Sequence, residues 1–129
     1  MEQITLNNIS EPAGKSMNDA LQWFCDSLGL ISLRDKDNSC YRLFIELLKA
    51  SKLGKPLSSD ELSSKLNLAR GTVVHHLNRL IESGLVVVKD NRYSLKAKNL
   101  KDLISLVKKD VGSTLDNLEL VADKLDKSL

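Results

Sequence analysis

The chain has 129 residues, of which 42% are hydrophobic and 28% charged, a composition that fits one small globular domain with an appended element. No apolar run approaches the roughly 20 residues that a membrane helix needs, no secretory signal is recognisable at the start, and two cysteines are too few for a disulfide scaffold. We therefore exclude a large enzyme, a membrane protein and a secreted mini-protein, and expect a cytoplasmic protein.

Charge is unevenly distributed along the chain. The net charge is −3 over residues 1–38, +6 over residues 39–98 and −1 over residues 99–129. A basic middle segment between acidic flanks indicates that the middle segment meets a polyanion. The alternative is chance unevenness in a lysine-rich chain.

The N-terminal part is predicted to contain one helix. Residues 1–15 are polar and irregular, and we expect a flexible tail there. Ser16 is a suitable N-cap and Gly29 a suitable left-handed residue to close a helix. Apolar residues between them recur at alternating steps of four and three, which makes one stripe: Met17, Leu21, Phe24, Leu28 and Ile31. We expect residues 16–38 to be this helix and a charged connector, and to form a layer of a dimer.

Residues 39–98 are predicted to form three helices and a hairpin. A largely buried helix begins at Ser39, because apolar residues surround it. Ser58 and Glu61 form a capping box that starts a short second helix, which ends near residue 66.

The third helix is predicted from about Arg70 to residue 83, with Gly84 closing it. The apolar period then changes from 3.6 to 2, which is typical of strands. The pair Asp90-Asn91 suits a two-residue hairpin turn with positive φ. With that turn, Val86 faces Leu95 and Val88 faces Tyr93.

Residues 99–129 have the most regular pattern, a heptad repeat over four heptads. Its a and d positions are Ala97, Leu100, Ile104, Val107, Val111, Thr114, Leu118, Val121 and Leu125. A helix over residues 100–128 would be about 43 Å long, longer than the interior of a domain of this size. We therefore expect a second copy to cover the stripe, with a dimer interface of Leu100, Ile104, Val107, Val111, Leu118, Val121 and Leu125. The pattern leaves open whether the paired helices run parallel or antiparallel, and whether the N-terminal helix packs within or across chains.

This order of elements predicts a mainly α (α+β) fold, a winged helix-turn-helix with a two-stranded wing and long terminal dimerisation helices. The stretch Leu57–Val88 resembles the ArsR-type winged-helix regulators, especially their archaeal branch. The resemblance is closest in Thr72-Val-Val-His-His-Leu77 and Leu80-Ile-Glu-Ser-Gly-Leu-Val86. It implies a dimer that places the third helix in the DNA major groove.

The residue pattern of the third helix supports this role. At 100° per residue, His75 is the centre of a polar face, whereas Val73, Leu77 and Leu80 form an apolar rear. We predict base readout by Thr72, His75, Asn78 and Arg79, of which Arg79 also reaches phosphates. Phosphate contacts are predicted for Arg70 at the helix start and for Lys89 and Arg92 beside the wing turn.

The sequence predicts no enzyme, metal site or cofactor. His75 and His76 are adjacent on a helix and point about 100° apart, unlike the i, i+4 pair that binds zinc. Cys25 and Cys40 are far apart in sequence, and Cys40 is interpreted as a small buried apolar residue. The main hypothesis is a dimeric, sequence-specific DNA-binding transcription regulator with no named effector. The alternatives are a winged-helix protein interaction module and a non-specific architectural DNA-binding protein.

Overall fold

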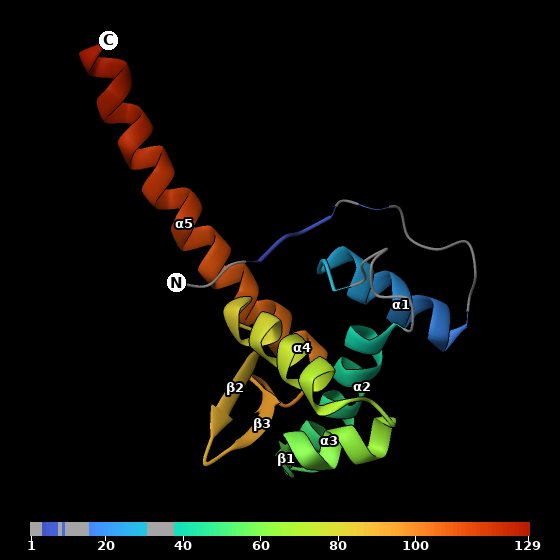
Figure 1. The fold of residues 1–129 in the computed structure, drawn as a ribbon. Helices are drawn as coiled ribbons and strands as arrows, with labels where there is room; N and C mark the ends of the chain where they lie inside the picture. Colours follow the sequence, from blue (N-terminus) through green and yellow to red (C-terminus); the bar gives the residue numbers. More distant parts are fainter. Residues whose placement is uncertain (1–3, 8, 10–15, 31–37) are drawn as a thin grey trace.

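The computed structural model describes residues 4–7, 9, 16–30 and 38–129. These residues form five helices and three short strands: α1 (Met17–Ser27), α2 (Ser39–Lys52), β1 (Leu57–Ser58), α3 (Ser59–Leu66), α4 (Arg70–Glu82), β2 (Val86–Lys89), β3 (Arg92–Leu95) and α5 (Leu100–Ser128). Helices α2, α3 and α4 lie beside the small sheet, and α5 projects away from them (Figure 1). This arrangement confirms the predicted winged helix-turn-helix fold.

The core is mainly aliphatic and is centred on α2. Leu43, Phe44 and Leu47 of this helix are fully buried, in one cluster with Leu62 of α3 and Leu77 of α4. Helix α2 contacts both α3 and α4 as well as strand β3. Because each fully buried apolar side chain of this size stabilises a fold by about 1.5–3 kcal/mol, the cluster fixes the angle between α3 and α4.

The helix-turn-helix begins and ends as its local sequence predicts. The Ser58 hydroxyl accepts a hydrogen bond from the Glu61 amide at 3.1 Å, and the Glu61 carboxylate accepts one from the Ser58 amide at 3.4 Å. Asn67, with a left-handed φ of 53°, ends α3. Helix α4 has no side-chain cap on its first amides, because Ala69 occupies its N-cap position. These amides remain able to donate hydrogen bonds to an anion.

The sheet has one strand more than predicted. The hairpin β2–β3 has the expected register, with Val86 opposite Leu95 and Val88 opposite Tyr93. Its turn residues Asp90 and Asn91 have φ of 53° and 60°, as a two-residue turn of this kind requires. Strand β1 pairs with the other edge of β3 and gives the order β1-β3-β2, so the two-stranded wing continues into a three-stranded sheet.

Helix α1 covers one end of the core. The predicted N-cap is confirmed, since the Ser16 hydroxyl accepts a hydrogen bond from the Asp19 amide at 3.1 Å. Gly29 has a φ of +73°, as predicted for the closing residue. The predicted stripe is buried only in its second part: Leu28 is buried, Leu21 and Phe24 are half-buried, Met17 is exposed and Ile31 lies outside the described residues.

Both cysteines are buried thiols near the contact between α1 and α2. Burial, and to a lesser extent the neighbouring Cys40, raises the pKa of the Cys25 thiol to about 12. The thiolate is the reactive form of cysteine, so Cys25 is held in its unreactive form at neutral pH. The interpretation of Cys40 as a small buried residue is confirmed.

Helix α5 is continuous from Leu100 to Ser128 and begins with a side-chain cap, in which the Asn99 side chain accepts a hydrogen bond from the Asp102 amide at 2.8 Å. We call residues 100–112 the docked half of this helix. Residues 113–129, which are the rest of the helix and Leu129 after it, are called its free half. In the docked half, Leu103 is fully buried, and Leu100, Ile104 and Val107 pack against the core. Every residue of the free half is exposed.

Candidate nucleic-acid interface

Helix α4 separates an apolar rear from a polar front. Val73, Leu77 and Leu80 are fully buried, as predicted. On the opposite side His75 and Asn78 are exposed, and Thr72 and Arg79 are half-buried. All four residues predicted to read bases are therefore at least partly exposed on one helix. The predicted apolar rear and polar front of this helix are confirmed.

The sequence makes no definite prediction for two further residues of α4, His76 and Val74. His76 is buried at 6% exposure, and its ring lies next to that of His75 with the ring centroids 5.5 Å apart. Val74 is exposed at 36%, so the front of the helix also offers an apolar surface. Helical spacing places neither residue at the centre of a face, so the burial of these two side chains could not be predicted from the sequence.

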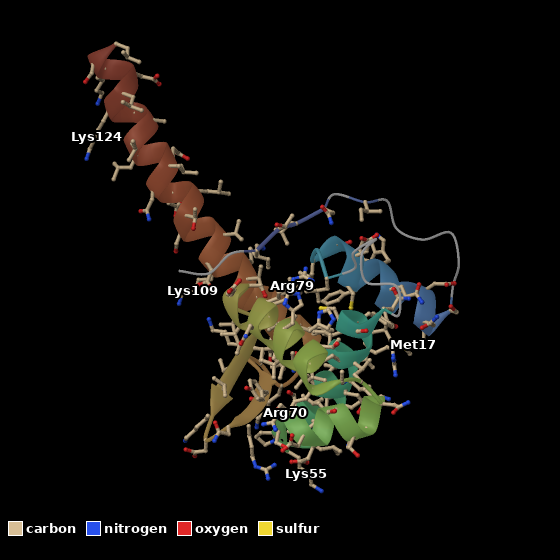
Figure 2. The ribbon with its side chains drawn as sticks, viewed as in Figure 1. Met17, Lys55, Arg70, Arg79, Lys109 and Lys124 are labelled. Carbon is tan, nitrogen blue, oxygen red and sulfur yellow. The ribbon has the colours of Figure 1, made fainter. Side chains whose placement is uncertain are left out.

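Two of the three predicted phosphate-binding residues, Arg70 and Lys89, are exposed at the start of α4 and beside the hairpin turn. Arg70 is at the end of α4 that lies near α3 (Figure 2) and approaches Asp60, with 3.5 Å between its Nε and the carboxylate Oδ1. Lys89 is exposed at the end of β2, next to the hairpin turn. Arg70 and Lys89 therefore present cations at the start of α4 and at the wing tip.

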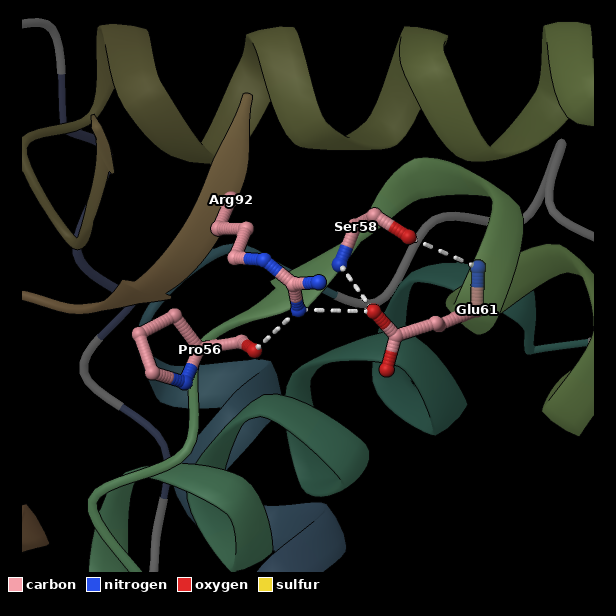
Figure 3. Close-up of polar contacts among 4 residues, drawn as sticks. All are labelled: Pro56, Ser58, Glu61 and Arg92. Carbon is pink, nitrogen blue, oxygen red and sulfur yellow. Dashed lines mark hydrogen bonds and ion pairs between the residues drawn. The ribbon is translucent and has the colours of Figure 1, made fainter. Parts of the chain in front are cut away.

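Arg92 points in another direction. Its Nη1 donates hydrogen bonds to the Glu61 carboxylate at 2.8 Å and to the Pro56 carbonyl at 3.2 Å (Figure 3). Arg92 and Glu61 also line an open groove of about 670 Å³ that borders α2 and α3 and includes Lys49 and Lys65. The sequence identified Glu61 as a capping residue but gave no signal for its contact with β3, because that contact joins residues far apart in the chain.

The Glu61 carboxylate is stabilised in its charged form. Its hydrogen bond from the Ser58 backbone has the largest effect, followed by the bond with the Ser58 side chain, and Arg92 adds to both; together they lower the pKa of Glu61. A carboxylate that is ionised at neutral pH can hold a guanidinium through a charge-assisted hydrogen bond.

The described residues contain no group of three or more histidine, cysteine and acidic side chains that could hold a metal ion. Within the same residues, no helix is both long and apolar enough to cross a membrane.

Comparison with known proteins identifies the helix-turn-helix. The family model described as bacterial regulatory protein, arsR family, matches residues 46–88, which extend from the middle of α2 through most of β2. A search of curated proteins found no match. The predicted resemblance to this family is confirmed, whereas the assignment to an archaeal branch stays a prediction. Residues 46–88 of this chain are therefore similar to the arsR family, and this match supports a DNA-binding transcription regulator.

Proposed function

We propose that the protein is a homodimeric, sequence-specific transcription regulator that inserts α4 into the DNA major groove. The observation that carries this proposal is the exposed front of α4, where His75 and Asn78 are accessible, with the cations Arg70 and Lys89 exposed at the start of this helix and at the wing tip. A major groove about 12 Å wide accommodates one helix, and short polar side chains on its front reach the base edges. The family of the helix-turn-helix supports the same function.

In this proposal the residues divide into two roles. Thr72, His75 and Asn78 contact bases, and Arg79 contacts a guanine or a phosphate, because these side chains share the front of α4. Arg70 and Lys89 contact phosphates on either side, and the net charge of +6 over residues 39–98 attracts the DNA backbone. We treat Arg92 separately below, because its guanidinium has partners within the protein.

The proposed dimer uses α5. In the free half, Leu118, Val121 and Leu125 are each more than half exposed, and they continue the stripe that Leu100, Ile104, Val107 and Val111 begin. A second copy offers the same stripe, so one two-fold axis would cover both. A dimer would also place two α4 helices on two half-sites.

We further propose that the chain acts in the cytoplasm without catalysis or a cofactor. The match to the arsR family supports this proposal, because a regulator of that kind acts by binding DNA and not by changing a substrate. Any effector would act by changing the affinity of the dimer for DNA.

The test is selection of bound duplexes from a random DNA pool, followed by affinity measurements at several salt concentrations. Asn78→Ala should remove about 1–3 kcal/mol of preference at one or two base pairs and leave the salt dependence unchanged. Lys89→Ala should weaken binding to all sequences and lower the salt slope by about one. Lys124→Ala, which removes the same charge from the free half of α5, is the matched control and should change neither quantity.

Two other outcomes would replace the proposal. Equal loss of affinity for all sequences in both interface variants would indicate an architectural DNA-binding protein. Weak binding of the wild type to DNA even at low salt would instead favour the protein interaction module, because the electrostatic attraction between a protein and DNA is strongest at low salt.

A further inference from the structure

The contacts of Arg92 connect the wing to the helix-turn-helix. Arg92 is the first residue of β3, directly after the hairpin turn, and its backbone lies opposite Ser58 of β1. Ser58 is in turn the N-cap of α3. The Nη1 atom of the Arg92 side chain lies 2.8 Å from the Glu61 carboxylate in the first turn of α3.

One oxygen of Glu61 joins these elements. Oε1 accepts hydrogen bonds from both the Ser58 amide and the Arg92 guanidinium, at 3.4 Å and 2.8 Å (Figure 3). The Arg92 guanidinium also donates to the Pro56 carbonyl, just before β1. The start of α3, strand β1 and the start of β3 therefore meet at one ion pair. We call the contacts of Arg92 with Glu61 and Pro56 the wing clasp.

The wing clasp lies where it affects the position of the wing tip. Lys89, a proposed phosphate contact, is the cross-strand neighbour of Arg92 on β2. Helix α3 packs against α4, so the start of α3 is fixed relative to the recognition helix. The contact between Arg92 and Glu61 thus connects the wing tip to the helix that packs against α4.

We propose that Arg92 is a positioning residue, which holds the wing against the start of α3 through Glu61 and thereby places Lys89 for DNA contact. The second part of this inference rests on the proposed DNA-binding function. It differs from the role expected from the sequence, in which Arg92 itself contacts a phosphate. The two roles predict opposite effects of neutralising Glu61, and this makes them separable.

Glu61→Gln is the informative variant, because glutamine at this position of a capping box keeps the helix start while the charge is lost. If Arg92 positions the wing, Glu61→Gln weakens DNA binding even though it removes a negative charge. If Arg92 binds phosphate and Glu61 competes for it, the same variant strengthens DNA binding.

The first measurement is the affinity of the full chain for a selected duplex over a range of salt. Because an exposed ion pair contributes only modestly, Arg92→Ala and Glu61→Gln should each weaken binding by about two- to fivefold. Their salt slopes should equal that of the wild type, and the double variant should bind no more weakly than Arg92→Ala. Glu46→Gln, which neutralises a carboxylate that pairs with Lys49 on its own helix, controls for the general effect of lost negative charge. Tighter binding by Glu61→Gln, or a salt slope lowered by about one in Arg92→Ala, would overturn the inference.

The second measurement needs no DNA. Amide hydrogen exchange of the strands in the unbound protein should be about two- to fivefold faster in Arg92→Ala and in Glu61→Gln, and unchanged in Glu46→Gln. Unchanged exchange in the first two variants would refute the wing clasp. Faster exchange in a protein whose wild type does not bind DNA would refute the proposed function and leave the wing clasp supported.

Discussion

The docked half and the free half of α5 belong to one uninterrupted helix and carry one apolar stripe, yet their surroundings differ. Leu103 in the docked half is completely buried, whereas Leu118 in the free half is 61% exposed. The heptad pattern placed Leu118 at the centre of the stripe and Leu103 outside its a and d positions. The comparison teaches that periodicity shows which face of a helix is apolar, while the neighbouring surface decides which side chain is buried.

The largest effect should come from the docked half. Leu103→Ala removes a fully buried side chain and should lower the free energy of unfolding by about 2–5 kcal/mol, as measured by urea denaturation. The matched control is Leu120→Ala in the free half, whose side chain is exposed and should cost less than about 0.5 kcal/mol. Similar costs for the two variants would mean that the halves do not differ as described.

The free half should affect association instead. Leu118→Asp places a charge in the proposed seam and should raise the dimer dissociation constant by roughly 10- to 100-fold, measured by sedimentation at micromolar concentrations. Leu120→Asp, which lies on the other side of the same turn, is the control and should leave the constant nearly unchanged. A wild type that sediments as a folded monomer would contradict the proposed dimer.

The junction of the two halves offers a smaller effect. Gly112 lies within the helix, and a Cβ added there would meet no atom within 4 Å. Gly112→Ala should therefore stabilise the helix by about 1 kcal/mol and raise the melting temperature. A lower melting temperature would show that the two halves need the glycine where they meet.

The smallest effects should come from the exposed ion pairs of the two halves. Asp110 lies 3.9 Å from Lys96 at the end of the docked half, and Asp123 lies 3.1 Å from Lys127 in the free half. Asp110→Asn and Asp123→Asn should each change the free energy of unfolding by less than about 1 kcal/mol. A clearly larger loss for Asp110→Asn would mean that its pair helps to hold the docked half on the domain.

The elements that follow from local chemistry could be predicted from the sequence. Ser58 and Glu61 determine the start of α3 within four residues, and Asp90 with Asn91 determines the hairpin turn. Strand β1 could not be found in this way, because it has two residues and exists only through its pairing with β3.

The candidate site shows the same division. Helical spacing correctly placed His75 and Asn78 at the surface and Leu77 in the core. It could not show that Glu61 accepts the guanidinium of Arg92, since that ion pair joins residues 31 positions apart. Such contacts depend on how the elements pack, which no local pattern records.

The straightness of α5 has a consequence for how two half-sites would be read. The free half extends about 26 Å beyond the domain at 1.5 Å per residue. A bend of only about 10° at Gly112 would move its end by about 4 to 5 Å, more than the roughly 3.4 Å between successive base pairs. In a dimer joined through this segment, the stiffness of the helix would determine how far the distance between two DNA half-sites can vary.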